Sequence, residues 1–339
     1  MNLDVLIPSL LLPAPILKLF PPPAVPALER MLARADTRVA STPGGGASWL
    51  CERWGVGAPY PVAPLLAEYD GFDPSNDGWM FAEPVHLTPD RDRLKLFPAR
   101  FLELREAETR QLITILNSHF ADRNLQFVAP AHASLSQRWY VRCAPAEIPE
   151  TTPPNAARVG SLADFQPRSR GTLNWRSLQN EAQMLFFGHP VNEAREAAGK
   201  PTISGVWFWG GGILPELKRA AYDCVATDSA IAMQLARKSG IPVLPPSWDS
   251  IRSAQGNVLA VIDSCAESAG SLDFPAWRHE LERLDREWFQ PMSRALATGN
   301  IQYLSIFAPD VEDTRSFHLT RRNHFLRFWR AAKPLSRYA

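Results

Sequence analysis

The chain has 339 residues, of which 45% are hydrophobic and 21% charged, so it can bury a substantial globular core. Its formal net charge of +1 excludes a global electrostatic signature of nucleic-acid or anionic-membrane binding. The four cysteines (Cys51, Cys143, Cys224 and Cys265) form no Cys-x-x-Cys pair, which argues against a zinc module or a disulfide framework and favours reduced thiols in a cytoplasmic protein.

The apolar opening, residues 1–23, is interrupted by prolines and lacks the basic n-region and cleavage site of a signal peptide. No other run approaches the roughly 18 apolar residues of a transmembrane helix, so we expect no membrane association. Residues 4–8 are predicted to form a short buried strand. Residues 25–35 repeat apolar side chains at helical spacing and predict a helix, whereas residues 41–64 contain too many glycines and prolines for regular structure.

The next segment, residues 75–150, is predicted to be a small α+β domain. Its pattern predicts a helix over residues 103–120 and strands over residues 79–89, 93–99, 125–130 and 138–143. The polar, proline-bearing stretch 151–170 is predicted to be a linker.

From residue 171 onward, predicted helices and strands alternate. Helices are expected over residues 178–187, 230–240 and 281–292, and strands over residues 205–210, 223–229, 258–263 and 302–309. Trp207 and Trp209 alternate with Val206 and Phe208, so both faces of their strand are apolar, which predicts a central parallel strand. We therefore expect residues 1–74 and 171–339 to form one α/β core, a mostly parallel sheet with helices on both faces.

Several segments carry a family resemblance. The stretch 188–212, GHPVNEAREAAGKPTISGVWFWGGG, resembles a motif of the archaeal-type cofactor-independent phosphoglycerate mutases, a branch of the alkaline phosphatase superfamily. Weaker similarities lie in residues 25–35, 71–74, 225–243 and 272–285. The resemblance implies an alkaline-phosphatase-like α/β core interrupted by a small α+β inserted domain.

Enzymes of this family use a serine nucleophile beside two divalent metal ions, which activate the nucleophile and neutralise the phosphoryl group. This sequence departs from that pattern. No carboxylate follows Asp4 at the end of the first strand, and Val62 and Ala63 stand where the resemblance puts the serine and a neighbouring aspartate. In the late ligand cluster Glu267 is kept, but the ligand positions become Ala266, Gly270 and Ser271.

Our preferred interpretation is a noncatalytic or repurposed protein, a pseudoenzyme with a regulatory, ligand-sensing or interaction role and no cofactor. In overall layout the chain is similar to the bacterial RpfE-type regulatory proteins. The alternative is an active phosphoglycerate mutase or metal-dependent phosphatase with a rebuilt site. That site would hold two divalent metal ions, Mn or Zn, and use Asp228, Glu267, Asp310 or His318.

Five residues besides Asp228 are candidate ligand-binding residues. His189, Asn192 and Arg195 are expected either to form an anion pocket at a helix start or to build a structural corner in which Asn192 caps the helix. Gly210 and Gly212 end a strand at an edge where open α/β sheets bind ligands. Asp228 is placed at the same kind of edge and is alternatively a helix N-cap.

The C-terminal stretch 318–330, HLTRRNHFLRFWR, predicts an amphipathic helix packed on the core with a basic outer face, in preference to a nucleic-acid contact. The expected partners are a small anionic or phosphorylated ligand and a protein. We expect neither a nucleic acid nor a membrane among them.

Overall fold

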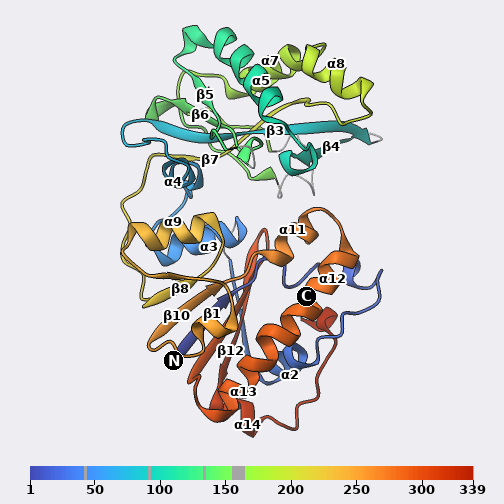
Figure 1. Ribbon diagram of the computed structural model, residues 1–339, viewed down its shortest axis with the longest axis vertical. Helices are drawn as coiled ribbons and strands as arrows, with labels where there is room; N and C mark the ends of the chain where they lie inside the picture. Colours follow the sequence, from blue (N-terminus) through green and yellow to red (C-terminus); the bar gives the residue numbers. More distant parts are fainter. Residues whose placement is uncertain (42–43, 91–92, 133–134, 155–164, 339) are drawn as a thin grey trace. The chain divides into compact units, whose positions relative to one another are not determined.

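The structure is a computed structural model that describes residues 1–41, 44–90, 93–132, 135–154 and 165–338. Contacts divide the chain into two compact units, unit 1 (residues 1–56 and 217–339) and unit 2 (residues 57–216), which are drawn in Figure 1. The inserted domain predicted over 75–150 is narrower than unit 2, because residues 57–74 and 171–216 also belong to that unit. Residues 155–164 of the predicted linker lie outside the described residues.

Unit 1 contains a seven-stranded sheet. Its strands, in spatial order, are β2 (Asp36–Ser41), β12 (Asp313–Thr320), β11 (Tyr303–Pro309), β1 (Asn2–Leu6), β10 (Asn257–Val261), β8 (Cys224–Ala226) and β9 (Val243–Leu244). The five strands from β11 to β9 are parallel, whereas β12 and β2 add an antiparallel edge. The α/β class is therefore confirmed, but the sheet is partly antiparallel, and the alkaline-phosphatase-like arrangement stays a prediction.

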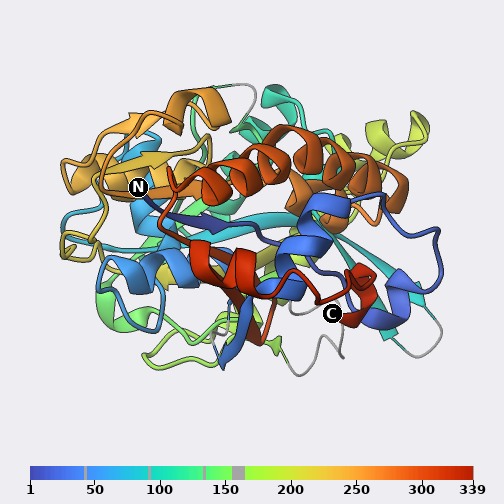
Figure 2. The same cartoon turned by 90° about the horizontal axis from the view of Figure 1, so that it is seen from below.

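Helices cover both faces of this sheet. One face carries α2 (Pro26–Arg34) and a continuous helical run made of α12 (Phe274–Leu284), a π-helical turn and α13 (Gln290–Thr298), seen in orange in Figure 2. The other face carries α3 (Gly45–Arg53), which contacts β11, and α9 (Ala230–Lys238), which contacts β8. The shorter helices of unit 1 are α1 (Ala14–Leu17), α10 (Trp248–Ile251), α11 (Ser264–Gly270) and α14 (Arg321–Leu326).

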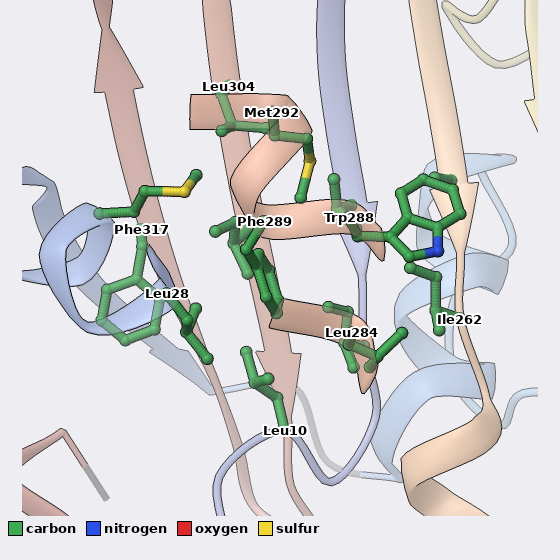
Figure 3. Packing of buried hydrophobic residues seen from close by; sticks show 14 of the residues in the cluster. Leu10, Leu28, Ile262, Leu284, Trp288, Phe289, Met292, Leu304 and Phe317 are labelled. Atoms are coloured by element: carbon green, nitrogen blue, oxygen red, sulfur yellow. The ribbon is translucent and has the colours of Figure 1, made fainter. Parts of the chain in front are cut away.

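The core of unit 1 lies between the sheet and the α2, α12 and α13 layer. Figure 3 shows Leu28 of α2 and Phe289 and Met292 of the long run pointing toward Leu304 and Phe317 of the strands. All five side chains are buried. Burial of large apolar side chains contributes about 1.5–3 kcal/mol each, so this layer supplies much of the stability of unit 1.

Two predictions for unit 1 and its neighbouring segment are wrong. Residues 41–64, predicted to be irregular, contain α3 and the start of α4 (Val62–Tyr69). Gly44 adopts a left-handed φ of 100° and starts α3, whose Trp49 and Leu50 are buried, so tertiary packing outweighs the poor helix propensity of glycine.

The C-terminal segment also differs from the prediction. Residues 313–320 form β12, and only six residues form α14. On α14 the polar His324 is buried, whereas Phe325 and Leu326 are exposed. The expected amphipathic helix with its apolar face on the core is therefore wrong, because the segment docks through polar groups.

Unit 2 is built on an antiparallel sheet of five strands: β4 (Arg93–Pro98), β3 (Gly78–Asp90), β6 (Tyr140–Cys143), β5 (Gln126–Val128) and β7 (Gly205–Gly212). Its helices are α4, α5 (Glu106–His119), α7 (Trp175–Phe186) and α8 (Pro190–Ala197). The prediction of β7 as a central parallel strand is wrong, because β7 pairs antiparallel with β3, with Trp207 opposite Glu83. Within the described residues, no helix has the length and apolar character needed to cross a bilayer.

Candidate functional site

The residues predicted to form an anion pocket lie at the start of α8 in unit 2. His189 is the N-cap, and its Nδ1 accepts a hydrogen bond of 3.2 Å from the backbone N–H of Val191. Asn192 is not the cap, which corrects that alternative. Its buried amide donates to the carbonyls of Phe186 (2.8 Å) and Ile203 (2.9 Å) and accepts from the N–H of Ile203 (2.7 Å).

Arg195 is 2% exposed and its guanidinium is surrounded by acceptors of unit 2. Nη1 forms an ion pair of 3.0 Å with Glu108, Nε donates to the carbonyl of Pro201 (2.7 Å), and Nη2 donates to the carbonyl of Leu102. Glu108 also accepts from the N–H of Arg105 at the start of α5. These contacts are those of a structural corner, and the role of these residues in binding an anion stays a prediction.

The glycines at the end of β7 lie against the start of α4. A Cβ added to Gly212 would lie 2.4 Å from the Cβ of Pro61, and one added to Gly210, whose φ is +65°, would lie 3.7 Å from the backbone N of Ala63. Val62 and Ala63 are 6% and 0% exposed. Gly212 thus allows β7 to lie close to Pro61, the residue before the two apolar residues that stand where the resemblance puts the nucleophile and its neighbour.

Asp228 lies at the carboxyl edge of the parallel sheet, as expected. It follows β8, and Asp263 follows the neighbouring parallel strand β10. Burial raises the pKa of Asp263, and the nearby charge of Asp228 raises it further. A hydrogen bond from the Ser229 hydroxyl acts in the opposite direction. Ser229, not Asp228, is the N-cap residue of α9, so the capping alternative for Asp228 is wrong.

The other alternative catalytic residues lie on separate elements of unit 1. Glu267 is exposed on α11, and Asp310 follows β11 with its carboxylate accepting from the N–H of Val311 (2.8 Å). His318 lies within β12, in register with Ser305. In the part of the chain that the structure describes, no three His, Cys, Asp or Glu side chains are grouped to hold a metal ion, and the two-metal alternative stays a prediction.

A polar row crosses one face of the unit 1 sheet. Asp4, Ser305 and His318 are in register on the adjacent strands β1, β11 and β12, so their side chains point to the same face. The ring Nδ1 of His318 lies 3.2 Å from the Ser305 hydroxyl, and the Tyr222 hydroxyl donates to Asp4 (2.9 Å). Parallel strands covered by helices usually carry apolar side chains on both faces, so a row of polar side chains on one face is unusual. The one indication of this polar row in the sequence is Asp4, a charged residue within a strand of mainly apolar residues.

A cavity of about 270 Å³ opens beside this row in unit 1. Its lining residues come from β1, β10, α3 and the segment before β8: Asn2, Asp4, Arg53, Ala221, Tyr222, Asn257 and Val258. The site lies at the amino ends of the parallel strands, because Asn2 and Asn257 are the first residues of β1 and β10. No sequence pattern indicates a ligand site at this end of the strands.

Arg53 supplies the positive charge of this cavity. Its guanidinium lies over the rings of Trp49 and Phe307, 4.5 Å and 5.2 Å from their centroids, which holds it in place by cation–π attraction. No carboxylate forms an ion pair with Arg53 among the described residues. Burial lowers the pKa of His318, and the charge of Arg53 contributes to the same shift.

Acceptors complete the cavity. Asn2 donates from Nδ2 to Asn257 (2.9 Å), while the buried Oδ1 of Asn2 has no hydrogen-bond partner among the described residues. Burial raises the pKa of Tyr222, so its hydroxyl stays protonated and donates to Asp4. A guanidinium beside a carboxylate suits a small molecule that carries both an anionic group and a hydroxyl donor.

No known protein-family model matches the chain, and a search of curated proteins also finds no match. The solved structures that are similar to it include two that cover most of the chain. One is the cofactor-independent phosphoglycerate mutase of Thermoplasma acidophilum, at 16% identity and a TM-score of 0.45 over 94% of this chain and 90% of that one. The other is a protein of Pyrococcus horikoshii, at 13% identity and a TM-score of 0.48 over 94% of this chain and 87% of that one.

Proposed function

We propose that this chain is a noncatalytic, ligand-sensing protein on a phosphoglycerate-mutase-like scaffold, with a regulatory role. The observation that carries this proposal is the start of α4, where the apolar side chains of Val62 and Ala63 are buried. A serine nucleophile must be exposed to its substrate and beside its activating groups. Two apolar, buried side chains at these positions provide neither the hydroxyl nor the access.

The donor set at the remaining matched positions supports the same proposal. The segment after β1, which includes Pro8 and Ser9, has no carboxylate, and Ala266, Gly270 and Ser271 lie on α11 or at its end. Divalent metal ions such as Zn²⁺ and Mn²⁺ are held by carboxylates, imidazoles and thiolates. Alanine, glycine, proline and serine side chains offer none of these, so this set does not suit two divalent metal ions.

The ligand that we propose is small and anionic, phosphorylated or carboxylated, with at least one hydroxyl group. Arg53, preorganised on its two aromatic rings, would hold the anionic group through a forked pair of N–H donors. Asp4 would accept from the hydroxyl group. The volume of about 270 Å³ fits a metabolite of a few carbon atoms and excludes a polymer.

Catalysis is tested directly. Purified protein supplied with Mn²⁺ or Zn²⁺ is assayed for conversion of 3-phosphoglycerate to 2-phosphoglycerate and for hydrolysis of p-nitrophenyl phosphate, and we expect no turnover. Metal-dependent turnover that is lost in Asp228→Asn or Glu267→Gln would establish the active alternative instead.

Ligand binding is tested by titration calorimetry with 3-phosphoglycerate as the probe. Charge-assisted hydrogen bonds contribute about 1.5–3 kcal/mol, so Arg53→Gln should weaken binding by at least about tenfold. Arg294→Gln is the matched control, because Arg294 is exposed on α13, on the opposite face of the sheet. Equal weakening by both variants, or no effect of Arg53→Gln, would contradict the proposed ligand position.

A further inference from the structure

The C-terminal segment of unit 1 carries an unusual cluster of exposed apolar side chains. Phe325, Leu326, Phe328 and Trp329 are 51%, 59%, 73% and 68% exposed, and they fall within five consecutive residues. Isolated exposed apolar residues are normal on soluble proteins, but a contiguous cluster marks a contact surface. We call these four residues the aromatic tip. In Figure 1, α14 lies at the end of unit 1, and Figure 2 shows it in front of the sheet.

Polar contacts fix the other side of this segment to unit 1. The guanidinium of Arg327 forms an ion pair of 2.7 Å with Asp36 and donates to the carbonyl of Arg34 (3.0 Å). Asn323 donates to Asp36 (2.8 Å), and Arg34 donates to the carbonyl of His324 (3.1 Å). Because the polar side faces the protein, the apolar side chains are held outward rather than left there by a loose terminus.

Positive charge surrounds the aromatic tip. Residues 314–339 contain six arginines and one lysine and no acidic residue, whereas the whole chain has a net charge of only +1. The rest of the chain is therefore net negative. Arg321 lies over the ring of Phe325 (5.9 Å), and Arg330 lies over the ring of Trp329 (5.6 Å), so the cations flank the exposed rings.

We propose that the aromatic tip docks on an anionic lipid bilayer surface and holds the protein there peripherally. Phe, Leu and Trp side chains partition into the headgroup and acyl boundary, while flanking arginines are attracted to anionic headgroups. The aromatic tip is too short to span a bilayer. Each basic residue near the membrane surface raises the affinity for anionic lipid by about fivefold. The association is therefore reversible and sensitive to salt.

Two features favour a bilayer over the other partners of a basic aromatic surface. Single-stranded nucleic acid stacks on aromatic rings that remain accessible and uses free polar edges, but Leu326 offers no stacking face and the indole N–H of Trp329 already donates to the carbonyl of Leu326 (3.1 Å). An apolar tip with basic flanks and no acidic residue matches the chemistry of an anionic membrane interface.

The experiment is co-sedimentation of the full chain with vesicles. Binding is compared between phosphatidylcholine vesicles and vesicles in which about a third of the lipid is phosphatidylserine, at low and high salt. Phe328→Ser/Trp329→Ser removes two side chains that are 73% and 68% exposed, and Arg321→Gln/Arg322→Gln removes two exposed charges. The control Met184→Ser/Phe187→Ser removes two side chains of unit 2 that are 76% and 91% exposed.

We expect binding to the anionic vesicles alone, reduced at least tenfold by either tip variant and unchanged in the control. Absence of binding to anionic vesicles, or equal loss in the control, would overturn the proposal. A dimer in sedimentation analysis that Phe328→Ser/Trp329→Ser abolishes, without lipid binding, would assign the surface to a second copy. Binding of a single-stranded oligonucleotide through the same residues, again without lipid binding, would assign it to nucleic acid.

Discussion

The buried Arg195–Glu108 pair provides the sharpest test of the structural corner in unit 2. Arg195→Leu removes a guanidinium that is 2% exposed and leaves the carbonyls of Leu102 and Pro201 without their donors. Breaking one side of a buried ion pair typically costs about 3–5 kcal/mol. The Glu108 side chain keeps 19% exposure and can recover part of its hydration, so we expect a loss near the lower end, about 3 kcal/mol.

The matched control is Arg110→Leu on α5. Arg110 forms an ion pair with Glu106 at the surface, with side-chain exposures of 74% and 48%. Exposed pairs of this kind contribute about 0–1 kcal/mol, so the control should be nearly neutral. Both variants remove one arginine and one ion pair, and they differ in burial.

The assay is hydrogen exchange followed by mass spectrometry on the full chain. A chain of two units need not unfold in one step, so a local opening free energy is more informative than a single midpoint. Arg195→Leu should accelerate exchange over residues 102–108 and 195–203, because the guanidinium joins these segments. A change below about 1 kcal/mol, no larger than that of the control, would refute the assignment of Arg195 as a structural residue.

Three further outcomes are expected. Hydrogen bonds with Arg123, and then with His119, lower the pKa of Glu181 from 4.5 to about 2. The stability that ionised Glu181 contributes is therefore present above pH 4.5 and is lost as the pH falls toward 2. Glu181→Gln should reduce this loss of unfolding free energy at low pH, as measured by urea unfolding. Gly212→Ala should lower the stability of unit 2 by about 1–3 kcal/mol, since its Cβ would meet a proline side chain at 2.4 Å, as measured by exchange over α4. Asp285→Ala should cost about 1–3 kcal/mol, since its buried carboxylate accepts from the first turn of α2, and Asp285→Asn should recover part of this loss in thermal unfolding.

Much of the local structure could be predicted from the sequence. The helix predicted over residues 103–120 corresponds to α5, and the strands predicted over residues 258–263 and 302–309 correspond to β10 and β11. These segments have an unambiguous apolar period, which depends on residues that are neighbours in the chain. The edge position of Asp228 also followed from local order, because a residue after a parallel strand must lie at the carboxyl edge.

The pairing of β7 could not be predicted. Its sequence shows that both faces are buried, but a strand covered on both faces reads the same in a parallel and an antiparallel sheet. Its partner β3 begins more than 120 residues earlier, with Phe81 opposite Trp209. No local pattern links two segments so far apart, so the assignment of residues 171–216 to unit 2 needed the tertiary structure.

The candidate ligand cavity also could not be predicted from the sequence. The sequence shows Asp4 as a carboxylate within its first strand and His318 only as an alternative catalytic residue. Their common face with Ser305 depends on the register of three strands drawn from opposite ends of the chain.

The sequence by itself determined the α/β class and the strongest helices and strands, because each of these is a property of adjacent residues. The tertiary structure alone decided the partner of β7, the polar face with its cavity, and the outward direction of the aromatic tip. The physical reason is common to all three. Contacts between segments distant in sequence set the register of the strands and decide which face of a helix packs on the protein. Those contacts can override local apolar patterning.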